Sequence, residues 1–207
     1  MKHTEHFADL CVVGGGMAGI CAALSAARHG AQVVLMQDRG VLGGNASSEI
    51  RMWICGAHGK DHRETGIVEE LMLENFHQNP QLNYPLWDAT LFHAVSQQEN
   101  LTLLLNTSCL DAATENGKIV SVTGWQSPAE TMHTVKARFF ADCSGDSILA
   151  PLTGAAYRYG REARDAFGES IEPEQADKKT MGMSCLFQVR ETDREQKFTP
   201  PAWAYRY

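Results

Sequence analysis

The chain has 207 residues, of which 43% are hydrophobic and 21% are charged, and its formal net charge is −7. This length suffices for one complete domain and the start of a second, and the composition is that of a globular protein with a buried core. The acidic balance argues against nucleic acid and anionic membrane surfaces as partners, because both attract basic proteins. Met1–Asp9 is polar, and three glycines soon interrupt the apolar run after it, so we expect neither a signal peptide nor a membrane span.

The six cysteines are scattered along the chain, and no two of them have the C-x-x-C spacing. Isolated cysteines in apolar segments behave as small hydrophobic residues. We therefore expect a reduced, cytoplasmic protein without a redox-active disulfide. These cysteines are Cys11, Cys21, Cys55, Cys109, Cys143 and Cys185.

The first predicted elements form a strand–helix–strand unit. Phe7–Val13 is an apolar strand, and the glycines Gly14–Gly16 separate it from a helix over Met17–His29. Gly30 stands where a C-terminal cap is expected, and Ala31–Met36 is a second buried strand. Two strands joined by a helix within about 30 residues predict parallel pairing and a right-handed crossover.

A helical insertion over about residues 45–98 follows the second strand. Gln37–Ser48 is rich in Gly, Ser and Asn and reads as a loop. Apolar residues at helical spacing predict a helix over Glu64–His77, and Pro85 begins another that extends to Gln98. Leu101–Leu105 is a third parallel strand.

The pattern then changes to short strands joined by turns, which predicts an antiparallel meander. A further strand, Phe139–Cys143, returns to the parallel sheet. Ala155–Lys179 is irregular with short helices, and Met181–Arg190 is one more strand. The predicted meander strands are Ser108–Thr114, Lys118–Gln126 and Thr131–Phe139.

The turn after the first strand carries the spacing Gly14-x-Gly16-x-x-Gly19. The first glycine permits a tight turn, the second lets the backbone approach a pyrophosphate, and the third lets helix and strand pack closely. A pyrophosphate would lie at the positive end of the helix, against free N–H groups. We therefore predict a dinucleotide site that includes Gly15, Met17 and Ala18 as well.

An acidic residue normally follows the second strand and binds the ribose hydroxyls. Here Gln37 occupies the expected position and Asp38 comes next. The uncharged side chain of Gln37 can accept a hydrogen bond from a ribose hydroxyl. Asp38 can bind the ribose instead if the turn directs its carboxylate toward the ligand. Arg39 would suit a 2′-phosphate and hence NADP, so the nucleotide stays open at this point.

The stretch Leu10–Asn45 resembles the glutathione-reductase-type FAD-binding fold of the FAD-dependent oxidoreductases. In that fold a glycine pair after the second strand lies against the FAD diphosphate and ribityl region, and Gly43-Gly44 matches it. A purely NAD-binding domain has no need of this pair. The resemblance therefore favours FAD over NAD(P), with Gly43, Gly44 and Asn45 beside the cofactor.

The order of the predicted helices and strands also resembles that of the FAD-binding fold. In such FAD-binding proteins a meander follows the third parallel strand, and the chain re-enters the sheet at an Ala-Thr-Gly-like turn, here Cys-Ser-Gly. The resemblance implies that Ser144, Gly145 and Asp146 lie beside the cofactor and that the backbone around Cys109 lies along the adenine.

The predicted fold class is thus α/β, a Rossmann-like FAD/NAD(P)-binding fold with a parallel sheet, an antiparallel β-meander crossover and the start of a second domain. We expect an FAD-binding domain over residues 1–154 and an incomplete substrate domain over residues 155–207.

Two candidate catalytic residues follow the glycine pair. His58 can act as an acid or base near neutral pH, and Arg51 can bind a substrate carboxylate or stabilise a reduced flavin anion. His58 and His62 have a spacing that binds metal on a helix, but Gly56 and Gly59 disfavour a helix there, so we predict no metal site.

These features predict an FAD-dependent oxidoreductase that transfers a hydride between a small organic substrate and flavin. Two alternatives stay open, an NAD(P)-dependent oxidoreductase and a truncated or non-catalytic nucleotide-binding module. A missing C-terminal segment or a homo-oligomer would complete the site.

Overall fold

The computed structural model describes residues 1–57, 59–60, 63–182 and 189–205. The chain divides into two compact units, Met1–Arg158 and Tyr159–Tyr207. The predicted boundary at residue 154 separates an FAD-binding domain from a substrate domain, and this assignment of ligands to the two domains stays a prediction.

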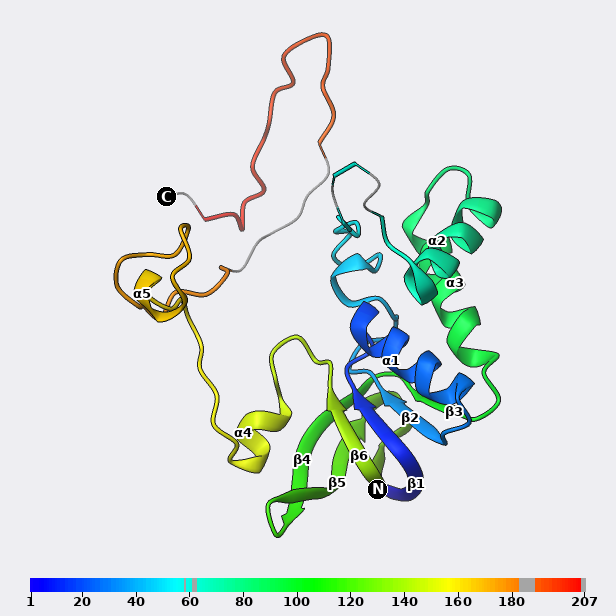
Figure 1. Ribbon diagram of the computed structural model, residues 1–207. Helices are drawn as coiled ribbons and strands as arrows, with labels where there is room; N and C mark the ends of the chain where they lie inside the picture. The colour runs from blue at the N-terminus through cyan, green and yellow to red at the C-terminus, as the bar shows by residue number, and fades with distance from the viewer. Residues whose placement is uncertain (58, 61–62, 183–188, 206–207) are drawn as a thin grey trace. The chain divides into compact units, whose positions relative to one another are not determined.

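The first unit is built on a six-stranded mixed sheet with the order β3-β2-β1-β6-β5-β4 (Figure 1). The pairs β1–β2, β2–β3 and β1–β6 are parallel, whereas β5–β6 and β4–β5 are antiparallel. This arrangement confirms the predicted fold class of a parallel sheet with a meander. The strands are β1 (Lys2–Val13), β2 (Val33–Met36), β3 (Leu101–Leu104), β4 (Thr107–Glu115), β5 (Lys118–Gln126) and β6 (Thr131–Asp142).

The prediction was wrong about β1 and β6. The third meander strand and the return strand are one continuous strand, β6, which pairs with β5 along one edge and with β1 along the other. The register joins Lys2 to Thr131 and Val13 to Asp142, so β1 begins at Lys2 rather than at Phe7. The first half of β1 is polar and largely exposed, and therefore lacks the apolar signal of a buried strand.

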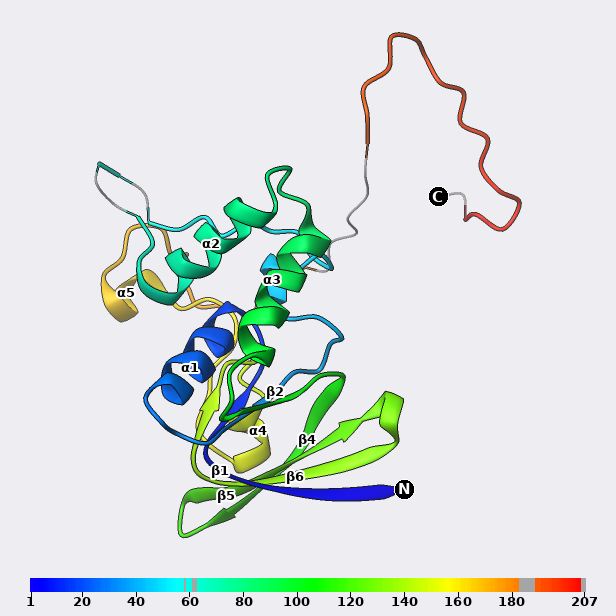
Figure 2. The ribbon, with the colours of Figure 1, turned by 90° about the vertical axis from the view of Figure 1, so that its right-hand side faces the viewer.

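Helices α1 (Met17–Arg28) and α3 (Tyr84–Ser96) lie on one face of the sheet, and α2 (Gly66–Gln78) packs against these two helices (Figures 1 and 2). Their existence confirms the predicted helices. Ile20 and Leu24 of α1 and Leu91 of α3 are fully buried in a core that includes Val12 and Leu35 of the sheet. This burial anchors the start of α1 directly above the end of β1.

A second cluster of buried residues lies on the opposite face of the strands, because successive side chains alternate across a sheet. Cys11 and Val13 of β1 pack there with Val122 and Val135 of the meander. The short helix α4 (Leu149–Thr153) adds Leu149 to this cluster. The meander is therefore part of the core.

The second unit contains the short helix α5 (Arg164–Phe167) and a local pairing of two segments. The backbone N–H groups of Arg161 and Asp177 each donate to the other's carbonyl at 3.0 Å, and their side chains form an ion pair. The strand predicted over Met181–Arg190 falls mainly on residues 183–188, which lie outside the described residues. Among the helices of the described part, none is both long and apolar enough to cross a membrane.

Candidate functional site

A cavity of about 630 Å³ lies where the parallel strands end, and we call it the carboxyl-end cavity. Val13 and Met36 are the last residues of β1 and β2, and Cys143 directly follows β6. Open α/β sheets bind ligands at this edge, where the strand order reverses, and the volume suits a cofactor. Thirteen predicted cofactor residues line it, namely Gly14, Gly16, Met17, Ala18, Gln37, Asp38, Gly43, Gly44, Asn45, Cys109, Ser144, Gly145 and Asp146.

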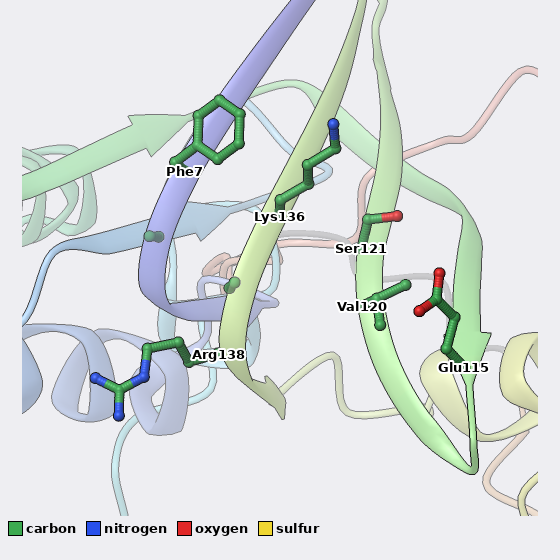
Figure 3. Close-up of a pocket in the computed structure, with 8 residues that line it drawn as sticks. Phe7, Glu115, Val120, Ser121, Lys136 and Arg138 are labelled. Carbon is green, nitrogen blue, oxygen red and sulfur yellow. The ribbon is translucent and has the colours of Figure 1, made fainter.

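Another hollow, of about 450 Å³, is a groove over the middle of β1, β5 and β6. Figure 3 shows Phe7, Lys136 and Ser121 projecting from these neighbouring strands. The Lys136 ammonium group is already 2.9 Å from the Glu5 carboxylate and 5.5 Å from the centre of the Phe7 ring. Its charge is thus satisfied within the sheet, and the carboxyl-end cavity is the stronger candidate site.

The glycines that shape the turn after β1 have different packing roles. A Cβ atom on Gly14 would approach the Cys143 carbonyl oxygen to 2.4 Å, and one on Gly19 would approach the Gly14 oxygen to 1.8 Å. A Cβ on Gly15 would meet the Leu42 side chain at 2.7 Å. Gly15 and Gly19 are not among the described residues that line the cavity, so they shape the loop through its internal packing.

Gly16 is the glycine whose missing side chain faces open space. Among the described atoms outside its chain neighbours, a Cβ on Gly16 would find only the Gly44 Cα within 4 Å, at 4.0 Å. Helix α1 begins at the next residue, and its described first turn contains no acidic side chain to occupy the free N–H groups. Backbone amides beside an open gap at a helix N-terminus fit a diphosphate.

The side chain of Gln37 forms hydrogen bonds to the backbone of the loops around it. It is 3% exposed, its Oε1 accepts a hydrogen bond from Gly15 N at 2.7 Å, and its Nε2 donates to the Val41 carbonyl at 3.0 Å. Asp38, in contrast, is exposed and lines the cavity. Of the two residues predicted for the ribose, Asp38 is therefore the one with a free carboxylate to offer.

The glycine pair packs directly against the turn after β1. Gly43 N donates to the Gly15 carbonyl at 2.9 Å, and Gly43 and Gly44 have φ values of +107° and +58°. A Cβ on Gly43 would come within 2.9 Å of Leu91, so this residue must be small. Gly44 is consequently held against Gly16, and a Cβ on Gly44 would approach the Gly16 Cα to 3.1 Å.

Asp142, which the sequence analysis did not select, holds the turn after β6. Its Oδ1 accepts hydrogen bonds from Ser144 N at 3.1 Å and Ser144 Oγ at 2.6 Å, and its Oδ2 accepts one from Leu149 N at 2.8 Å. These bonds fix Ser144, Gly145 and Asp146 at the cavity rim. An aspartate at the end of the return strand was the available signal.

Two cavity cysteines are poorly suited to thiolate chemistry. Burial raises the pKa of Cys109 to about 11, and burial followed by the charge of Asp142 raises the pKa of Cys143. Both thiols therefore stay protonated at neutral pH, where the thiol is a weak nucleophile.

The structure describes only one of the two predicted catalytic residues. Arg51 is not among the described cavity-lining residues, and its Nε donates to the Ser48 carbonyl at 3.0 Å. His58 lies outside the described residues. Met52 and Trp53, which the sequence analysis did not select, do line the cavity. In the described part of the chain, no three His, Cys, Asp or Glu side chains gather as a metal site.

A family model described as FAD dependent oxidoreductase matches residues 9–205. This chain belongs to the FAD-dependent oxidoreductase family. Membership supports FAD as the cofactor, and it decides between FAD and NAD(P).

Curated relatives of this chain include glycerol-3-phosphate dehydrogenase of Mycobacterium leprae and glycerol-3-phosphate dehydrogenase 2 of Mycobacterium tuberculosis. Each is 37% identical over 71 residues, which are 34% of this chain and 12% of the relative. The chain thus spans about an eighth of the length of these relatives.

Solved structures with a similar fold include the flavin-dependent brominase Bmp2, with a TM-score of 0.52 and 16% identity over 75% of this chain and 42% of that chain. The myxobacterial chondrochloren halogenase CndH has a TM-score of 0.50 and 18% identity over 69% of this chain and 38% of that chain. At these identities the likeness shows the fold alone.

Proposed function

We propose that this chain binds FAD in the carboxyl-end cavity and serves an enzyme that transfers a hydride between a small organic substrate and flavin. The observation that carries the proposal is the open space beside Gly16 at the start of α1, where a Cβ would find only the Gly44 Cα within 4 Å among the described atoms outside its chain neighbours. A diphosphate in this gap would meet backbone N–H groups without displacing a side chain.

The residues around the gap suit the other parts of the cofactor. Asp38 would bind the adenosine ribose through its carboxylate, and the β4 backbone near Cys109 would lie along the adenine. On the opposite rim, Gly145 and Asp146 would meet the diphosphate side of the cofactor, and Asn45 would lie near the ribityl chain.

Bound FAD supplies the acceptor for a hydride from an organic substrate. The chain's part is to hold the cofactor and to place charge and proton-transfer groups near the reacting atoms. We assign the proton-transfer task to His58, and to Arg51 the binding of a substrate carboxylate. In the structure, the bond from Arg51 to Ser48 must open for this task.

We further propose a cytoplasmic location, supported by the free thiols of the five described cysteines. The second unit would begin the substrate domain, which further chain or a second copy would complete. Phe167, Ile171 and Trp203 of this unit are 72%, 92% and 84% exposed, and a completed domain would cover them.

The test compares Gly16→Val with Gly182→Val. Gly16 has φ −69°, which any residue adopts, so the valine variant should fold while its side chain fills the diphosphate gap. Gly182 has no described atom within 4 Å of a Cβ and makes a matched control. We expect Gly16→Val to lose measurable FAD binding in calorimetric titration and Gly182→Val to bind like the unchanged chain. A folded Gly16→Val protein with unchanged FAD affinity would overturn the proposed site.

A further inference from the structure

An exposed pair of large apolar side chains stands at the carboxyl-end cavity. Met52 is 58% exposed and Trp53 is 73% exposed, and both line the cavity. Scattered apolar residues are normal on a protein surface, but an adjacent Met–Trp pair facing a ligand cavity indicates a covering partner. The partner expected in this cavity is the cofactor.

The chain holds this pair in place through a fixed bend. Arg51 has a φ of +61°, an uncommon value for a residue with a side chain. Three hydrogen bonds maintain the bend: Arg51 N donates to the Ser47 carbonyl at 2.8 Å, Met52 N donates to the Asn45 carbonyl at 2.9 Å, and the Tyr84 hydroxyl donates to the Arg51 carbonyl at 2.8 Å. The chain therefore returns to the cavity beside Asn45.

The position of the pair selects one half of FAD. Thr107 N donates to the Gln37 carbonyl at 2.8 Å, which places the start of β4 beside Asp38 and assigns that part of the cavity to adenosine. The space assigned to the diphosphate lies beside Gly16, against which Gly44 packs, and Met52 adjoins Asn45, the residue after Gly44. FAD carries its second flat ring system, the isoalloxazine, on the far side of the diphosphate from adenosine.

We propose that Trp53, supported by Met52, is the wall against which the isoalloxazine ring of FAD packs. The inference rests on the proposed function, since it requires FAD in this cavity. An indole offers a flat apolar face for stacking, and a thioether makes favourable contacts with aromatic rings. The backbone bend at Arg51 directs Trp53 to the cavity.

The experiment compares FAD with ADP, which contains the adenosine and diphosphate but lacks the flavin ring. Isothermal titration of the full chain would measure both dissociation constants for the unchanged protein and for Trp53→Ala. We expect Trp53→Ala to raise the Kd for FAD about tenfold and to leave the Kd for ADP unchanged. Trp53→Phe keeps an aromatic face and should retain most of the FAD affinity. Trp203→Ala removes another exposed indole, which is 84% exposed in the second unit, and should change neither constant.

Each outcome decides between the two proposals. An unchanged Kd for FAD in Trp53→Ala would overturn the inference while leaving the proposed function intact. Equal weakening of FAD and ADP would also overturn it, because the side chain would then support adenosine or the loop as a whole. Failure of the unchanged chain to bind both FAD and ADP would overturn the proposed function, and the inference with it.

Discussion

At the scale of single residues, the cavity is shaped by glycines, which have no side chain, and by polar side chains that already form hydrogen bonds within the protein. Gly14 and Gly19 are small because neighbouring backbone atoms fill the space of a Cβ, whereas Gly16 leaves a gap for a ligand. The glycine spacing predicted all three positions, since their roles follow from local geometry. The spacing could not show that Gln37 is bonded to Gly15, because that contact depends on the fold of the loop.

Gln37 and Asp38 should respond differently to substitution. Gln37→Leu leaves Gly15 N without its acceptor, and we expect the free energy of unfolding to fall by about 1–3 kcal/mol. Asp38→Asn should leave stability unchanged and weaken FAD binding about tenfold, because a charged acceptor becomes a neutral one. Urea denaturation and calorimetric titration measure the two effects. Full FAD affinity in Asp38→Asn would remove Asp38 from the ribose site.

At the scale of elements, the helices and the parallel strands were predictable from apolar periodicity, but the start of β1 and the continuity of β6 were not. The first half of β1 is polar and gains its strand conformation by pairing with β6, a contact between residues far apart in the sequence. The bend at Arg51 likewise depends on a contact between residues distant in the sequence, because the Tyr84 hydroxyl donates a hydrogen bond to the Arg51 carbonyl. Trp53 therefore had no sequence signal that separated it from an ordinary surface residue.

A histidine pair joins β1, β6 and β5 and should make stability depend on pH. His6 Nε2 lies 2.9 Å from His133 Nδ1, and His133 Nε2 lies 3.2 Å from Gln126 Oε1. Burial lowers the pKa of both imidazoles below the ordinary value of 6.5, and the nearby charges of His6 and Lys2 lower the pKa of His133 further. The folded protein therefore resists protonation that the unfolded chain accepts. Stability should be complete above pH 6.5 and fall as the pH drops through 6.5 toward the lower folded pKa values.

Urea denaturation between pH 8 and pH 5 would measure this dependence, over a range chosen to span about one and a half pH units on either side of an ordinary histidine pKa. His133→Gln removes one titrating ring and should flatten the profile, whereas His3→Gln changes an exposed residue of the neighbouring strand β1 and should not. An identical pH profile in His133→Gln and the unchanged chain would contradict this account of the pair.

At the scale of the whole molecule, the site gathers the ends of three parallel strands, the start of α1, the loop after β2 and the start of β4. The family and the cofactor were predictable because the glycine turn, the glycine pair and the order of elements are local in sequence. The substrate was not, because the short match to curated relatives covers 12% of their length and Arg51, the candidate substrate-side residue that the structure describes, is not among the described cavity-lining residues. The central claim therefore concerns the cofactor.

An absorption spectrum of the purified chain tests that claim most directly, recorded after incubation with FAD and removal of free cofactor. The account predicts flavin bands near ~450 nm and ~370 nm that stay with the protein. A folded, colourless protein that takes up no FAD would contradict it.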